Sequence, residues 1–177
     1  DHGIRGDEAK RDAEFCRRLC DERGVKLRLL EADVPAEAKK SGESVEEAAR
    51  RIRYAFFDSV MEEEHIPLLA TAHNADDNAE TVILNLTRGS GTRGVCGIPA
   101  VRSVKNGTLV RPLLCVTRAE IEEYCRENGL SYVTDSTNLC DDYARNRIRH
   151  RVLPELRLLN PDVVGAIGRL SAAASED

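Results

Sequence analysis

The stretch that decides the fold runs Ile66-Pro-Leu-Leu-Ala-Thr-Ala72 and continues as His73-Asn-Ala-Asp-Asp77-Asn-Ala-Glu80. Its first part is a short apolar run, which is typical of a parallel strand buried on both faces. A helix is predicted directly afterwards, with Asn74 or Asp76 as its cap. Ligands of open α/β sheets bind at the carboxyl ends of the strands, so a site is expected at this helix start.

Three carboxylates stand in the first turns of this helix. Asp76 and Glu80 are four residues apart and Asp77 and Glu80 three apart, so the side chains are expected to share one helix face. The helix dipole stabilises one or two anions, but three repel one another unless a cation lies among them. The expected occupant is a divalent metal such as Mg²⁺ or a substrate ammonium group. Ordinary first-turn capping is the alternative; the neighbouring His73 and the preceding strand favour a functional site.

Helices and strands alternate outward from this stretch. Residues 7–23 form a helical pattern that Gly24 ends, and Ser44 with Glu47 opens a long helix as a capping box. Residues 25–31 alternate like a strand, whereas residues 35–42 indicate a polar connection. Asn106-Gly107 predicts a hairpin turn, and Thr117 with Glu120 a second capping box. A short strand is predicted at 131–134, an arginine-rich helix up to residue 159, and a last helix after Asn160-Pro161.

This order predicts the α/β class, with a doubly wound, mostly parallel sheet and a helical C-terminal extension. The catalytic domain is expected over residues 1–159, and residues 160–177 are expected to begin a helical linker. The first half offers only two strands and no glycine-rich phosphate loop. The chain is therefore expected to start inside its domain, after the first strand.

The net charge of −5 is unevenly distributed. Residues 81–119 contain no acidic residue but carry Arg88, Arg93, Arg102, Lys105, Arg111 and Arg118, and a second basic cluster comprises Arg145, Arg147, Arg149, Arg151 and Arg157. A basic surface on an otherwise acidic protein is typical of an enzyme that binds a polyanion; dispersed, solvated arginines are the alternative.

The six cysteines include no pair with zinc-site or redox spacing. No apolar run approaches the roughly 20 residues of a membrane helix and the N-terminus is charged, so a cytoplasmic protein is predicted.

Six motifs stand in the order known from one family. They are His2-Gly3-Ile4-Arg5-Gly6, Glu47-Ala48-Ala49-Arg50, Ala72-His73 with Asp76-Asp77 and Glu80-Thr81, Arg88-Gly89-Ser90-Gly91, Arg111-Pro112-Leu113-Leu114, and Tyr143 with Arg145-Asn146-Arg147-Ile148-Arg149-His150. With them the chain resembles the N-terminal catalytic domain of the tRNA(Ile)-lysidine synthases, a family of PP-loop ATP pyrophosphatases. The resemblance implies an adenine nucleotide alpha hydrolase-like fold. Two features depart from the family: Asn74 replaces a frequent second histidine, and the Ser-Gly-Gly-x-Asp-Ser phosphate loop would lie upstream of Asp1.

The resemblance also implies a reaction. ATP adenylates the C2 oxygen of the wobble cytidine in a tRNA(Ile) with a CAU anticodon, and free lysine displaces AMP to form lysidine. The implied catalytic residues are Asp76, Asp77, Glu80 and His73, the first three also holding Mg²⁺. The implied ATP contacts are His2, Gly3, Arg50, Arg88, Gly89, Gly91, Arg145 and Arg147, and the implied tRNA contacts are Arg93, Arg149 and Arg151.

Two other functions remain open. A tRNA 2-thiolation enzyme of the same superfamily shares the adenylation chemistry, although such enzymes usually rely on paired cysteines and those of this chain are scattered. A non-catalytic tRNA-binding remnant would keep only the basic surface. We expect the isolated chain to be inactive and to dimerise or aggregate through the strand edge that its first strand would cover.

Overall fold

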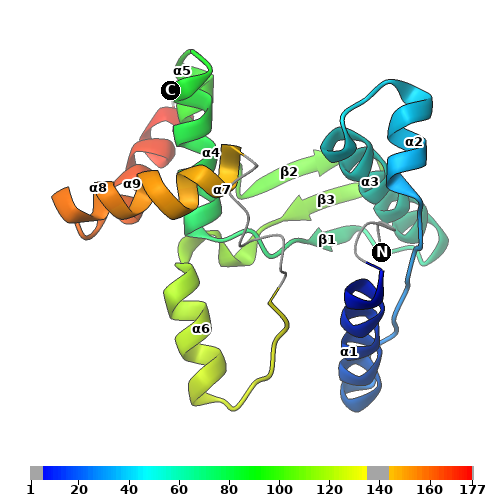
Figure 1. Cartoon of the computed structure of the whole chain (residues 1–177). Coiled ribbons are helices and arrows are strands. Elements are labelled where there is room, and N and C mark those ends of the chain that lie inside the picture. The colour runs from blue at the N-terminus through cyan, green and yellow to red at the C-terminus, as the bar shows by residue number, and fades with distance from the viewer. Residues whose placement is uncertain (1–5, 135–143, 177) are drawn as a thin grey trace. The chain divides into compact units, whose positions relative to one another are not determined.

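The structure is a computed structural model that describes residues 6–134 and 144–176 (Figure 1). The described chain divides into two compact units. One comprises the residues up to 69 together with 104–107, and the other comprises 70–103 and the residues from 108 onward.

Three helices make up most of the first unit: α1 (Asp7–Arg23), α2 (Val34–Ser41) and α3 (Val45–Glu63). Gly24 ends α1 in the left-handed conformation, and Ser44 and Glu47 form the capping box at the start of α3, both as predicted. The two helices α2 and α3 bury Val34, Ala38, Ala48 and Ala49 against one another.

Two predictions in the first unit were wrong. Residues 25–31 form no strand, because an alternating pattern needs a partner strand to become one. Instead Lys26 binds Glu64 at 2.6 Å and Arg28 pairs with Glu63, so the two cations of the alternating pattern tie the segment to the end of α3. Residues 34–41 are the helix α2 and no polar connection: the Asp33 side chain accepts a hydrogen bond from Ala36 N, and proline occupies the first turn.

The sheet has three strands, β1 (Leu68–Ala70), β2 (Val101–Val104) and β3 (Gly107–Val110), in the order β1-β3-β2. The predicted Asn106-Gly107 hairpin makes β2 and β3 antiparallel, whereas β1 and β3 run in the same direction (Figure 1). The prediction of an interior strand at 66–72 was wrong, because β1 is short, lies at an edge and leaves Leu68 55% exposed. No strand forms at 131–134 either.

The centre of the second unit is α4 (Ala75–Thr87), which packs against α9 (Val163–Glu176). The remaining elements are α5 (Thr92–Val95), the 3₁₀ turn η1 (Pro112–Cys115), α6 (Arg118–Glu127), α7 (Ala144–Arg147), the π-helical turn η3 (Ile148–Val152) and α8 (Leu153–Leu159). Ala79, Ile148, Leu153 and Val164 form the apolar core. Among the described residues no helix has both the length and the apolar character needed to cross a membrane.

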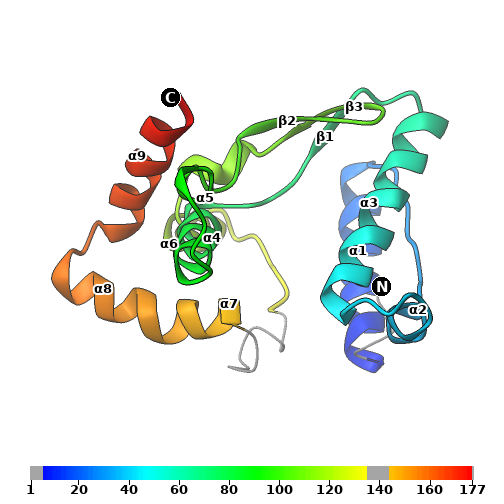
Figure 2. The ribbon, with the colours of Figure 1, turned by 90° about the horizontal axis from the view of Figure 1, so that it is seen from above.

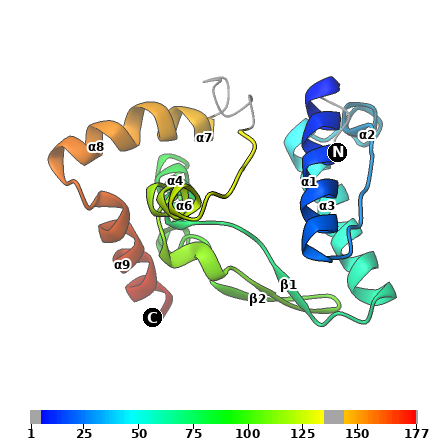
Figure 3. The same cartoon turned by 90° about the horizontal axis from the view of Figure 1, so that it is seen from below.

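The arginine-rich helix predicted up to residue 159 is interrupted. Figures 2 and 3 show α7, η3 and α8 as one rod, from whose end α9 turns back, but η3 within it is π-helical. Pro154 lacks an N–H and its ring would clash with the carbonyl four residues earlier, so the wider π turn just before it relieves the conflict. The Leu153 N–H accordingly donates to Ile148 O, five residues back.

The glycine-rich loop after α4 is held by amide side chains of that helix. Asn78 accepts a hydrogen bond from Ile98 N at 2.7 Å and Asn85 donates to Gly94 O at 3.0 Å. Gly97 has a φ of 66°, and a Cβ there would lie 2.2 Å from Asn78 Oδ1. The loop backbone is therefore held in one conformation, and this conformation requires glycine at position 97.

We expect Gly97→Ala to lower the free energy of unfolding by about 2 kcal/mol, because it combines left-handed strain with the displacement of a buried hydrogen-bonded amide. Gly168→Ala is the matched control, since it meets no atom within 4 Å inside α9. Replacing a helix-interior glycine should raise stability by about 0.5–1 kcal/mol. Urea unfolding of both variants measures the difference, and equal effects would contradict the interpretation of the loop.

Candidate active site

The start of α4 follows the carboxyl end of β1 by way of Thr71 and His73. The Thr71 hydroxyl lies 3.0 Å from His73 Nδ1, which orients the imidazole. Asn74 is the N-cap and forms a capping box with Asp77, each side chain accepting a hydrogen bond of 3.0 Å from the other residue's backbone N–H. One carboxylate oxygen of Asp77 thus holds the helix start.

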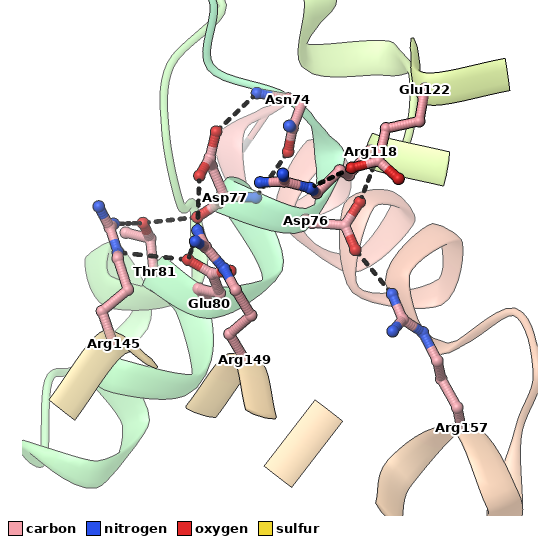
Figure 4. A network of polar contacts seen from close by, with 10 residues as sticks. All are labelled: Asn74, Asp76, Asp77, Glu80, Thr81, Arg118, Glu122, Arg145, Arg149 and Arg157. Carbon is pink, nitrogen blue, oxygen red and sulfur yellow. Dashed lines mark hydrogen bonds and ion pairs between the residues drawn. The ribbon is translucent and has the colours of Figure 1, made fainter. Parts of the chain in front are cut away.

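Glu80 lies one turn further along α4 and is completely buried. Arg149 binds the Glu80 carboxylate in a bidentate manner: Nε donates to Oε1 at 2.6 Å and an Nη donates to Oε2 at 3.0 Å (Figure 4). The same guanidinium lies 3.4 Å from Asp77 Oδ1. Asp77 and Glu80 therefore share one helix face and one arginine.

Arg145 approaches Glu80 from the same side, with Nε 3.5 Å from Oε2 and an Nη donating to Thr81 Oγ1 at 2.5 Å. The two arginines are four residues apart, so they project from one face of the α7–η3 segment. Ile148, between them in the chain, packs against Ala79 and holds this face to α4. The apolar core thereby sets the positions of both arginines.

Burial raises the pKa of Glu80, and the hydrogen bonds and charge of Arg149 offset only part of this rise. Burial acts to lower the pKa of Arg149, but the hydrogen bonds and charge of Glu80 outweigh it and the pKa is raised. Arg149 thus favours the charged form of the buried Glu80 carboxylate, but by less than burial disfavours it.

The Asp76 side chain is bound by residues of α6 and α8. One of its oxygens accepts from the Arg118 backbone N–H at the start of α6, at 2.7 Å, and the other accepts from Arg157 of α8 at 2.6 Å (Figure 4). Asp76 is bound by α6 and α8 and not by the arginine that Asp77 and Glu80 share, so the expectation that all three carboxylates converge was wrong for Asp76.

Arginine side chains provide the cations that the carboxylate cluster requires. Within residues 6–134 and 144–176 no three histidine, cysteine or carboxylate side chains are arranged to hold a metal ion. Because Asp76 binds Arg118 and Arg157 while Asp77 and Glu80 face Arg149, this arrangement does not fit one Mg²⁺ ion bound by all three carboxylates.

The structure places the other predicted residues as follows. Arg88, Gly89, Gly91 and Arg93 lie on the loop and short helix after α4, and Arg50 lies on α3 of the first unit with its guanidinium 4.8 Å from the Tyr54 ring centre. Arg147 and Arg151 are exposed, in contrast to Arg145 and Arg149. His2 and Gly3 lie outside the described residues.

Sequence reasoning missed three residues that shape this region: Asn78 and Asn85, which hold the loop, and Arg157, which binds Asp76. The buried Asn78 lies within the acidic helix, directly after Asp77, and a polar amide on the inner side of a helix was the available signal. Nothing local in the sequence indicates the partner of Arg157.

A family model described as a PP-loop domain matches residues 1–156. The chain belongs to the PP-loop domain family. In keeping with this, the structure resembles that of the U34-tRNA thiolase NcsA from Methanococcus maripaludis, with a TM-score of 0.77, 18% sequence identity, and coverage of 99% of this chain and 60% of the thiolase chain. The PP-loop fold is thus an adenine nucleotide alpha hydrolase-like α/β fold, as predicted.

Curated relatives of this PP-loop domain include the tRNA(Ile)-lysidine synthases of Geobacillus kaustophilus and Bacillus subtilis, which are 43% and 40% identical over 177 residues. Both matches cover 100% of this chain. A bifunctional TilS/HprT protein of Listeria monocytogenes is 39% identical over 99% of this chain. The chain spans 38% of the length of the first two relatives and 27% of the third.

Proposed function

We propose that this chain is the ATP-using part of a tRNA(Ile)-lysidine synthase. The supporting observation is the match along the whole chain, at about 40% identity, to proteins of that name within a PP-loop family. The substrates of the proposed reaction are ATP, free lysine and a tRNA(Ile) with a CAU anticodon. ATP activates the wobble cytidine at C2, and the lysine ε-amine then displaces AMP.

The chemistry of the proposed reaction suits the start of α4. The attacking lysine arrives as an ammonium ion and must lose a proton, so a carboxylate near the reacting centre can orient it and accept the proton. Asp77 is the best candidate, because its side chain is 20% exposed whereas Glu80 has no exposed surface. His73, held through Nδ1 by Thr71, is the candidate second proton carrier. The loop after α4 supplies backbone donors and Arg88 for the nucleotide.

The test is AMP release by the full-length gene product. We expect release to require ATP, lysine and tRNA(Ile) together, and the tRNA product to gain the mass of lysine less water. Lysine-independent AMP release with incorporation of sulfur would instead indicate a tRNA thiolation enzyme. Binding of tRNA without any AMP release would indicate a non-catalytic binding protein.

Exposed Arg147 should serve a different role from the paired arginines of the same segment. We expect Arg147→Ala to weaken binding of tRNA or ATP several-fold, and any tRNA defect to diminish at high salt because it comes from lost phosphate neutralisation. Filter binding at two salt concentrations and ATP titration measure this. Unchanged affinity for both ligands would remove Arg147 from the binding surface.

A further inference from the structure

Glu80 is placed where no substrate can reach it in the described structure. The residue has no exposed surface, and both of its oxygens face guanidinium nitrogens of Arg149 and Arg145. The arginines themselves are partly open to solvent, with 22% of the Arg149 side chain and 42% of the Arg145 side chain exposed. Beside Glu80, a ligand therefore meets these two guanidiniums and the partly exposed Asp77 carboxylate.

We propose that Glu80 is a positioning residue that aligns Arg145 and Arg149 as a clamp for a phosphate group of the substrates. This inference rests on the proposed function and assigns Glu80 a role other than binding lysine or metal. A guanidinium has a planar fork that matches phosphate geometry, and a buried carboxylate on one edge fixes the direction of that fork. Two such groups held by one anion form a preorganised site for a second anion.

The contacts around Arg145 support this arrangement. Its Nη donates to Thr81 Oγ1, and that hydroxyl donates in turn to Asp77 O at 2.8 Å, so the backbone of α4 also fixes the guanidinium. Its Nε is buried and makes no hydrogen bond within the described part of the chain, lying 3.5 Å from Glu80 Oε2. Arg145 is thus held by charge and by one hydroxyl, and its side chain keeps the larger exposed surface.

A direct role of Glu80 toward lysine conflicts with the same geometry. An ammonium ion could reach the Glu80 oxygens only after Arg149 gave up two hydrogen bonds and left a buried carboxylate, which is costly. Asp77 is 20% exposed and its contact with Arg149, at 3.4 Å, is longer than either bond of Glu80, so an ammonium ion displaces less to reach it. In this proposal Glu80 therefore positions the arginines, and Asp77 is the carboxylate that interacts with lysine.

The experiment compares Glu80→Gln and Glu80→Asp in the full-length protein. The amide of glutamine keeps the shape but loses the charge that aligns two guanidiniums. We expect Glu80→Gln to raise the KM for ATP, or the Kd for tRNA measured without ATP, about tenfold, with an unchanged KM for lysine. The two measurements distinguish a nucleotide phosphate from an RNA phosphate. Glu80→Asp keeps the charge and should recover part of the loss.

Glu122→Gln is the matched control, because it removes a carboxylate from an exposed pair with Arg118 at 2.7 Å and should change none of these constants. If Glu80→Gln fails to fold, Arg149→Lys replaces it, since a lysine keeps the charge without the fork and should show the same selective loss. A raised KM for lysine with normal phosphate binding overturns the proposal, as does lowered stability with all binding constants unchanged. Failure of the proposed function is a separate result, in which wild-type protein releases no AMP in response to lysine.

Discussion

Replacing Asp77 with Asn in the full-length protein should lower the rate of lysine-dependent AMP release by about 100-fold or more, while tRNA affinity changes little. The asparagine carbonyl can still accept the Asn74 N–H, so the start of α4 should survive. On the proposed function, the substitution removes the negative charge that would orient the lysine ammonium and accept its proton. It removes no phosphate contact, so tRNA binding should persist.

Single-turnover AMP release and tRNA binding to the same preparation measure the two effects. Asp21→Asn, which alters an exposed carboxylate on α1, is the control and should behave like the wild type. Near-normal turnover of Asp77→Asn would exclude Asp77 from the chemistry. Loss of tRNA affinity together with turnover would show that the substitution disturbs the fold or the RNA surface instead.

The second large effect concerns stability. Arg149→Met should lower the free energy of unfolding at pH 7 by about 3 kcal/mol, because it leaves the fully buried Glu80 carboxylate without its main partner. Methionine retains much of the apolar bulk of the arginine stem, so the loss should come from the charge. Urea unfolding at several pH values measures it.

The pH dependence has a definite sign. The pKa of Glu80 is raised in the folded protein by burial, and removing Arg149 should raise it further. Protonated Glu80 is neutral and tolerates burial, so the defect should be small below the ordinary glutamate pKa of about 4.3 and should grow as pH rises through the raised folded value. A defect that does not change with pH would contradict this account.

The double variant Arg149→Met with Glu80→Gln provides the internal control. Removing both charges should restore most of the stability at pH 7, because no uncompensated buried charge remains. Purely additive losses would mean that Arg149 stabilises the fold by packing alone.

Local features of the chain were predictable from sequence, since their determinants lie within a few residues. The capping boxes at Ser44 and Thr117, the stop at Gly24 and the hairpin at Asn106-Gly107 all form, and of the two candidate caps before α4 it is Asn74 that caps the helix. Each depends on side chains that bond to backbone groups no more than four positions away, or on the backbone preferences of one or two residues. The family motifs could also be recognised from the sequence, because each is short and they stand in the family's order.

Strands were predicted less well, because a strand exists only through pairing with a distant segment. Residues 25–31 alternate in character yet form ion pairs with α3 in place of a ladder, and the apolar run after Ile66 becomes an exposed edge strand. The π turn at 148–152 had a visible cause in Pro154, but whether the helix would end or adapt there depended on the packing of Ile148 and Leu153.

The sequence by itself determined that this chain is an α/β domain with acidic residues at one helix start and arginines in a later segment. Only the tertiary structure decided their pairing. Glu80 and Arg149 are 69 positions apart, and Asp76 and Arg157 are 81 apart. Both contacts arise because the apolar core lays the later segment along α4. The packing of that core, which consists of apolar residues, therefore decides that Glu80 is enclosed by arginines and that Asp77 stays partly exposed.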